Sequence, residues 1–207
     1  MNYFEDRIEA EAELREMLGY PNKIVEAMKI TYMERHCREF IGLSPILFAS
    51  TADLLGNCDV SPRGDAPGFV KVLDDHHLII PERPGNRRMN TYRNILENPH
   101  IGLIFIIPGL EETLRINGKA CLTKNPGLLA PLEAHGKIPK LAIGVEVEEV
   151  FLHCAKAFKR SELWDTKTWP GALPSVPEMI AAHAGRPDIT ADVVSKGLKE
   201  SYEKRMY

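Results

Sequence analysis

Two adjacent arginines, Arg87 and Arg88, stand close to the expected start of a short helix. A helix N-terminus already carries partial positive charge, so two guanidinium groups placed there raise the free energy unless an anion neutralises them. Free backbone N–H groups and bidentate guanidinium groups together suit a phosphate. The alternative is that both arginines are solvated, or that they pair with Glu82 and Glu97.

The segment around these arginines indicates how they are positioned. A strand is expected to end at Pro81, a Pro-Gly turn follows at 84–85, and Asn86 can cap a new helix. The helix must end at Asn98-Pro99, because proline cannot continue it. Between these limits lie apolar residues at helical spacing: Met89, Tyr92, Ile95 and Leu96.

The middle of the chain consists of short apolar or alternating segments separated by Gly and Pro turns. The expected strands are 45–51, 58–61 (ending at Pro62), 68–73, 77–81, 101–107, 113–123 and 141–147. The near-continuous apolar run 101–107 is typical of a strand covered on both faces. Such close spacing favours an antiparallel barrel over a parallel sheet, which would need a helix in each crossover.

Helical patterns flank and interrupt this β region. They cover 1–41, where Asn22 should cap a second helix, an insert at roughly 126–134, and the tail from residue 177. We therefore expect an α+β fold, mainly β with helical additions. The expected organisation is a single domain over 1–207, made of an N-terminal helical extension (1–41), a barrel core (42–155) and a C-terminal helical segment (156–207).

Composition limits the classes of function. The net charge of −3 over 207 residues lacks the basic excess of a general nucleic-acid binder. The four cysteines form no C-x-x-C pair, so a zinc site or dithiol is not expected, and adjacent histidines on a strand point to opposite faces and cannot easily share a metal. Without a signal-like or membrane-spanning apolar segment, we expect a cytoplasmic protein that does not associate with membranes.

Several motifs, in this order along the chain, resemble the pyridoxamine 5'-phosphate oxidase superfamily of FMN-binding split barrels. They are D-V-S-P-R-G-D (59–65), R-P-G-N-R-R (83–88), N-I-L-E-N-P (94–99), G-L-I-F (102–105) and T-L-R-I-N-G (113–118). The resemblance covers roughly 40–155. It looks closest to an uncharacterised branch that also carries H-C-A-K-A-F-K-R-S-x-L-W, at 153–164 in this sequence.

The resemblance implies a homodimer with flavin mononucleotide (FMN) at each subunit interface. Arg87 and Arg88 match the basic pair that holds the flavin phosphate, and Arg63 matches an arginine at the cofactor. The full set of implied cofactor-binding residues is Arg63, Ile80, Pro81, Asn86, Arg87, Arg88, Thr113, Arg115, Lys156, Ser161 and Trp164. The last three lie in a segment expected to cross toward the flavin pocket, although a solvated basic stretch anchored by Trp164 is an equal alternative.

The implied activity is two-electron or hydride transfer at flavin N5, with a nicotinamide or deazaflavin as a possible electron donor. No general acid or base is assigned, but Arg115 or Lys156 could steady negative charge on the flavin. The alternative is a non-catalytic flavin or haem carrier, with His135 or His153 as haem ligand. The chain lacks a W-G-G-x-R segment after residue 165 and has Gly64-Asp65 after Arg63, which argues against vitamin B6 oxidation.

Overall fold

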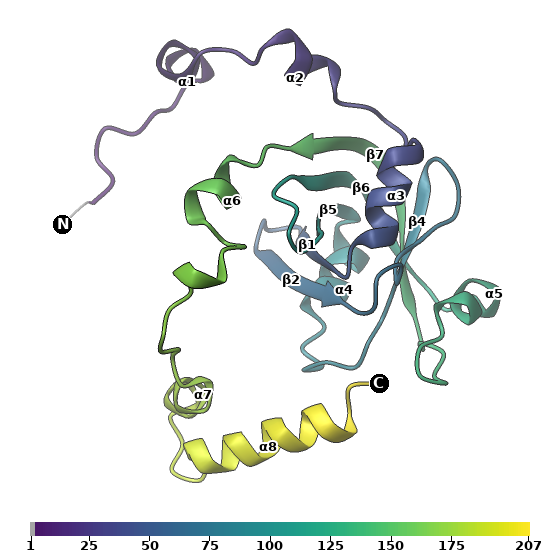
Figure 1. Cartoon of the computed structure of the whole chain (residues 1–207), viewed down its shortest axis with the longest axis vertical. Helices are drawn as coiled ribbons and strands as arrows, with labels where there is room; N and C mark the ends of the chain where they lie inside the picture. The colour runs from purple at the N-terminus through teal and green to yellow at the C-terminus, as the bar shows by residue number, and fades with distance from the viewer. Residues whose placement is uncertain (1–2) are drawn as a thin grey trace.

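The computed structural model describes residues 3–207. Within this range seven strands form one antiparallel sheet in the order β2-β1-β5-β6-β7-β4-β3. The sheet begins at β2 and ends at β3, and it curls into a split barrel (Figure 1). The strands are β1 (Ile46–Ala52), β2 (Cys58–Gly64), β3 (Lys71–Val72), β4 (His77–Pro81), β5 (His100–Ile106), β6 (Thr113–Thr123) and β7 (Ala142–His153).

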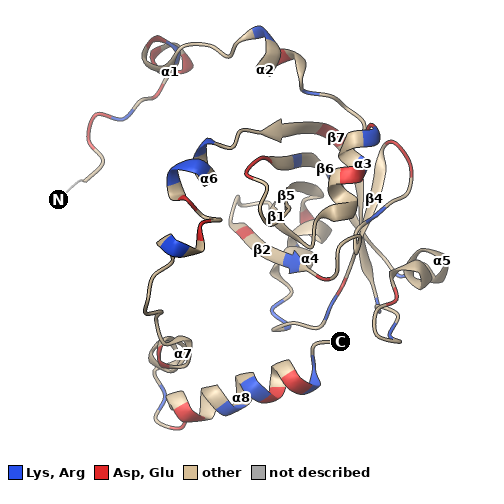
Figure 2. Cartoon of the chain, viewed as in Figure 1, with Lys and Arg blue, Asp and Glu red and all other residues tan. Residues whose placement is uncertain are grey.

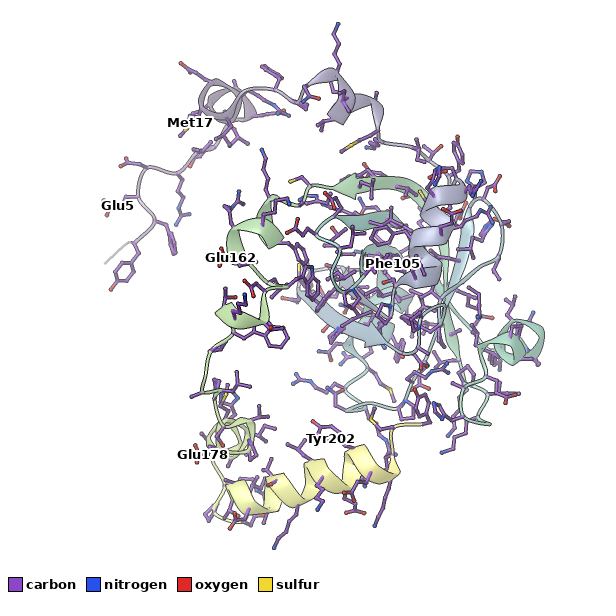
Figure 3. All side chains as sticks on the ribbon, in the orientation of Figure 1. Glu5, Met17, Phe105, Glu162, Glu178 and Tyr202 are labelled. Atoms are coloured by element: carbon purple, nitrogen blue, oxygen red, sulfur yellow. The ribbon has the colours of Figure 1, made fainter. Side chains whose placement is uncertain are left out.

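Helices flank the barrel and extend from it. They are α1 (Glu11–Leu18), α2 (Lys23–Ala27), α3 (Arg35–Leu43), α4 (Asn90–Glu97), α5 (Pro126–Leu129), α6 (Lys156–Ser161), α7 (Val176–Ala184) and α8 (Ala191–Lys204), with 3-10 turns at Ala130–Leu132 and Thr166–Thr168. Helix α3 packs on the barrel through Cys37 and Ile41. In contrast, α1, α2, α7 and α8 bury none of their residues and stand away from the barrel as two arms (Figures 1 and 3). The predicted α+β split-barrel fold is confirmed.

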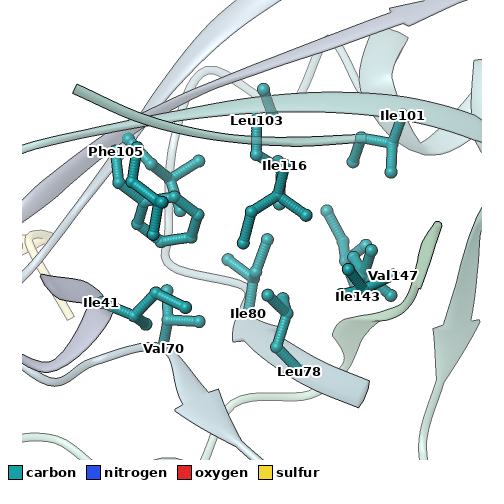
Figure 4. Packing of buried hydrophobic residues seen from close by; sticks show 14 of the residues in the cluster. Ile41, Val70, Leu78, Ile80, Ile101, Leu103, Phe105, Ile116, Ile143 and Val147 are labelled. Carbon is teal, nitrogen blue, oxygen red and sulfur yellow. The ribbon is translucent and has the colours of Figure 1, made fainter. Parts of the chain in front are cut away.

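The core fills the inside of the barrel with side chains from alternate strand positions. Leu103 and Phe105 on β5 are fully buried and face Leu78 and Ile80 on β4 (Figure 4). Burial of each such side chain contributes about 1.5–3 kcal/mol. Phe105 lies deep in the barrel, whereas the labelled residues of the arms project into solvent (Figure 3).

Two strand predictions need correction. Strand β2 does not stop at Pro62 but continues to Gly64, because β2 is an edge strand and Pro62 faces a partner, Phe48, on one side only. The apolar run of β5 is not covered on both faces, since burial alternates along it and Ile104 is 40% exposed. The 68–73 segment contributes only the two residues of β3.

The helix boundaries agree with the sequence at some positions and differ at others. The Asn22 side chain accepts hydrogen bonds from the N–H groups of Ile24 and Val25, so the predicted cap is confirmed. Asn86 does not cap α4, which begins only at Asn90. Its side chain instead accepts from the N–H of Arg88 at 3.0 Å and shapes the preceding loop. The 126–134 insert is divided into α5 and a 3-10 turn.

Among the helices within residues 3–207, none has the length and apolar content that a bilayer crossing requires.

Candidate functional site

A cavity of about 670 Å³ lies where the open edge of the barrel meets the loop between β4 and α4. Strand β2, the end of β4, the 82–89 loop and the first turn of α4 form its walls. Five of the predicted cofactor residues line it: Arg63, Pro81, Asn86, Arg87 and Arg88. Residues from both sides of the split, far apart in sequence, therefore meet at one cavity.

Arg63 reaches this cavity from β2, and its hydrogen bonding is incomplete. One terminal nitrogen, Nη1, donates to the hydroxyl of Tyr92 at 3.0 Å, and the guanidinium carbon lies 5.1 Å from the centroid of the Tyr92 ring. Its Nε is buried and has no hydrogen-bond partner among the described residues. A buried donor without an acceptor costs about 1–3 kcal/mol, so this atom is suited to a ligand oxygen.

Arg87 and Arg88 lie on the exposed loop just before α4 rather than inside its first turn. The backbone takes left-handed conformations at Arg87 (φ 60°) and at Met89 (φ 61°), which is uncommon for residues with side chains. Within residues 3–207 neither arginine pairs with Glu82 or Glu97, so the alternative of internal ion pairs is not realised. The two positive charges remain available at the cavity.

A hydroxyl and carboxylate network fixes the start of α4 against β2. The buried Thr91 hydroxyl donates to Asp59 Oδ2 at 2.7 Å and lies 3.0 Å from the Ser61 hydroxyl. Sequence reasoning missed this network. The alternation of side chains along a strand could have revealed it, because residues 59, 61 and 63 share one face of β2. In the structure that face is the half-buried one.

A second polar group, also missed by sequence reasoning, braces the cavity loop from the other side. Arg83 Nε donates to Asp65 Oδ2 at 2.6 Å, and Arg83 Nη2 donates to the carbonyl of Leu132 at 3.0 Å. The Tyr207 hydroxyl donates to the other oxygen, Asp65 Oδ1, at 2.8 Å. Burial by itself raises the pKa of Asp65, but the hydrogen bonds from Tyr207 and Arg83 outweigh it and hold the pKa below the usual value.

The remaining predicted residues lie away from this cavity within one chain. Ile80 is fully buried in the core, so only its backbone can face a ligand. Arg115 lies on β6, two strands beyond the neighbour of β2, with its guanidinium carbon 5.3 Å from the Phe151 ring centroid. Thr113, at the start of the same strand, is buried.

The basic segment after β7 also lies apart from the cavity. Lys156 and Ser161 are exposed on α6, which is one of the positively charged elements in Figure 2. The Trp164 indole donates to the carbonyl of Leu110 at 3.0 Å and stacks on Phe158, with ring centroids 5.8 Å apart. Trp164 therefore anchors this segment to the barrel, as the alternative interpretation expected, and the role of the segment in cofactor binding stays a prediction.

The histidines considered as ligands have different surroundings. The His135 ring packs on the Tyr207 ring at 4.1 Å, and His153 is exposed at the end of β7. His77 Nδ1 lies 2.9 Å from the Asp74 carboxylate in a polar turn. Across residues 3–207 there is no group of three or more His, Cys, Asp or Glu that could hold a metal ion.

Comparison of the sequence with known protein families identifies the family of this chain. The sequence profile of the family described as pyridoxamine 5'-phosphate oxidase matches residues 33–154, more than half of the chain and nearly all of the barrel. The chain belongs to the pyridoxamine 5'-phosphate oxidase family. The matched range includes the strands and loops that form the cavity. No functionally curated protein matches this family member in sequence.

Solved structures with a similar barrel are distant in sequence. HupZ of Group A Streptococcus is 19% identical, covering 57% of this chain and 92% of that chain, with a TM-score of 0.47. A putative pyridoxamine 5'-phosphate oxidase from Lactobacillus delbrueckii is 20% identical, covering 59% of this chain and 95% of that chain, with a TM-score of 0.48. HutZ, the heme storage protein from Vibrio cholerae, is 17% identical, covering 58% of this chain and 93% of that chain, with a TM-score of 0.42.

Proposed function

We propose that this protein is an FMN-dependent oxidoreductase whose cavity holds the flavin phosphate between Arg63 and the Arg87–Arg88 pair. The single observation that carries the proposal is the buried, unpartnered Nε of Arg63 in a cavity that two further unpaired arginines line. A phosphate monoester carries about −1.5 to −2 charges near neutral pH, so it would both satisfy the buried donor and neutralise the clustered cations.

The rest of the cavity suits the other parts of FMN. Phe69 and Pro81 offer apolar surface for the flavin ring, and the Ser61 and Thr91 hydroxyls offer polar contacts along one wall. When bound, the flavin supplies two-electron or hydride transfer at its N5 atom. The protein's own residues bind and orient it, and a small-molecule substrate with a nicotinamide or deazaflavin as electron donor completes the proposed reaction.

A homodimer is part of this proposal, and the outer face of the sheet supports it. Strand register aligns Pro62, Phe48, Ile104, Arg115 and Phe151 in one row across β2, β1, β5, β6 and β7. Phe48 is 36% and Ile104 is 40% exposed, and the row begins at the β2 edge of the cavity. A second copy on this row would bury apolar surface next to the cofactor site.

The same arrangement gives a role to the residues that lie away from the cavity in one chain. We assign Arg115, Lys156, Ser161 and Trp164 to the cavity of the partner subunit. Thr113, which is buried at the start of the same strand as Arg115, would support that face from within its own chain. The alternative function is a carrier protein that binds the cofactor without turnover. No contact among the described residues favours haem over flavin as its ligand.

The test replaces both loop arginines, as Arg87→Ala/Arg88→Ala. Loss of charge-assisted hydrogen bonds of about 1.5–3 kcal/mol in total should raise the FMN Kd about 10- to 150-fold, measured by flavin fluorescence titration. Circular dichroism should be unchanged, because both side chains are exposed on a loop. Arg93→Ala, which removes an exposed arginine of α4 outside the cavity lining, is the matched control and should bind FMN like the parent.

Equal FMN binding by the double variant and the parent would show that the phosphate does not lie at these arginines. Bleaching of the bound flavin by NADPH with continued turnover supports a reductase, whereas a flavin that is bound but never turns over supports a carrier. A Soret band in the spectrum of the purified protein would show that it binds haem, and the proposed cofactor would then be haem instead of flavin.

A further inference from the structure

The segment after α8 returns to the barrel, although the arm that leads to it does not. Helices α7 and α8 bury no residue, yet the chain beyond α8 turns back toward the barrel (Figure 1). Tyr207 makes four contacts there, beside the cavity loop. Its hydroxyl donates to Asp65 Oδ1 at 2.8 Å, and its carbonyl oxygen accepts from Lys137 Nζ at 2.5 Å. Its ring packs on His135 at 4.1 Å and lies 6.0 Å from the guanidinium carbon of Arg83. Tyr207 therefore holds a long, otherwise exposed arm at a defined place.

The Asp65 carboxylate connects Tyr207 to the cavity. Its side chain is 4% exposed, and its two oxygens take different donors. Oδ1 accepts from the Tyr207 hydroxyl and from the Ala66 N–H, both at 2.8 Å, and Oδ2 accepts from Arg83 Nε at 2.6 Å. The Asp65 N–H donates to the carbonyl of Pro45, which fixes this residue to the barrel. Arg83 in turn begins the loop that ends with Arg87 and Arg88 and itself lines the cavity.

We propose that Tyr207 is a positioning residue for the cavity loop 82–88, acting through Asp65 and Arg83, so that docking of the C-terminal arm sets how tightly the cofactor phosphate is held. This inference rests on the proposed function. It does not place Tyr207 in contact with the cofactor. The physical reason is that the Tyr207 hydroxyl is one of the two donors on Oδ1. Without it the buried carboxylate is less well compensated by hydrogen bonds, which weakens its ion pair with Arg83.

The protonation of Asp65 gives a pH dependence that a purely structural role of Tyr207 in packing would not produce. The charged and titratable groups that face this carboxylate are Arg83 from the loop and Tyr207 from the tail, and the Ala66 N–H also donates to it. Lys137 and His135 lie on the far side of Tyr207. Burial raises the pKa of Asp65, and the Tyr207 hydroxyl is the strongest influence that lowers it. Without that hydroxyl the pKa rises, so the carboxylate becomes protonated and loses Arg83 at a higher pH than in the parent.

The experiment compares the full-length parent with Tyr207→Phe, Tyr207→Ala and the control Tyr202→Phe, which changes a 63%-exposed tyrosine of α8. Hydrogen exchange of the 82–88 amides in the cofactor-free protein should be several-fold faster in both Tyr207 variants and unchanged in the control. The FMN Kd should rise about 3- to 10-fold in Tyr207→Phe and further in Tyr207→Ala. On acidification the phosphate loses its second charge near about pH 6 in parent and variants alike. The signature of Asp65 is the further loss of FMN affinity at lower pH, which should begin at higher pH in Tyr207→Phe than in the parent.

The outcomes separate this inference from the proposed function. Exchange at 82–88 that is unchanged in Tyr207→Phe and Tyr207→Ala overturns the inference, and so does faster exchange with an unchanged FMN Kd. A parent that binds no FMN overturns the proposed function, while its exchange data still decide whether Tyr207 orders the loop. Tyr207→Phe retains the ring packed on His135, so it reports on the hydroxyl even where Tyr207→Ala folds poorly.

Discussion

Replacing Arg63 by methionine should change stability and FMN affinity in opposite directions. In the unliganded protein the Arg63 Nε is buried without a partner, and this atom costs about 1–3 kcal/mol. Methionine has a similar length and no donor, so Arg63→Met removes that cost. It also removes the Nη1 hydrogen bond to Tyr92, worth about 1 kcal/mol net. The free energy of unfolding without cofactor should therefore stay the same or increase by up to about 2 kcal/mol.

FMN binding should respond with the opposite sign. A guanidinium hydrogen bond to a phosphate contributes about 1.5–3 kcal/mol, so Arg63→Met should raise the FMN Kd about 10- to 150-fold. Because a ligand stabilises the native state by RT ln(1 + [L]/Kd), the rise in Tm on adding FMN should also shrink, following the logarithm of the change in Kd. Urea unfolding without FMN and a fluorescence titration with FMN measure the two quantities separately.

One pattern of results would refute this reasoning about Arg63. If Arg63→Met unfolds at a free energy more than about 2 kcal/mol lower than the parent and binds FMN with the same Kd, the guanidinium is a structural group. The unpartnered Nε would then be an unfavourable consequence of packing Arg63 against Tyr92. The main reason for placing a phosphate in this cavity would no longer hold.

Two further predictions concern the barrel and its thiols. Gly118→Ala should lower the free energy of unfolding, measured in urea, by roughly 3 kcal/mol, because the new Cβ would lie 2.1 Å from the carbonyl oxygen of Glu146. The control Gly171→Ala places its Cβ in open space and should leave the free energy of unfolding nearly unchanged. Burial raises the pKa of the Cys37 thiol to about 11, so at about pH 8 iodoacetamide should label the three exposed cysteines and spare Cys37, as read by peptide mass spectrometry. Rapid labelling of Cys37 in the folded protein, or a fully stable Gly118→Ala barrel, would contradict the packing described above.

Local sequence chemistry was enough to predict several elements. Asn22 caps α2 because its side chain satisfies N–H groups two and three residues away, and such contacts depend only on neighbouring residues. Pro99 similarly requires α4 to end before it. The basic loop at 83–88 was visible for the same reason, since its arginines are adjacent in the chain. The order of these local signals also carried the family resemblance.

Contacts between distant segments decided the rest. The strand at Pro62 continues because β2 is an edge strand, and Ile104 is 40% exposed because the described residues leave that face of β5 partly open. Neither fact is present in the local pattern of apolar residues, which reports how a side chain prefers to be buried but not which element covers it.

The candidate site divides in the same way. The amino-acid sequence alone determined that positive charge is concentrated beside a short helix and that the surrounding segments form an antiparallel barrel. Only the tertiary structure decided that Arg63 would keep a buried donor unpaired, and that Tyr207 would share Asp65 with Arg83 across 142 positions. The reason is physical: hydrogen-bond satisfaction depends on what the folded chain brings within about 3 Å, and sequence separation does not limit that distance.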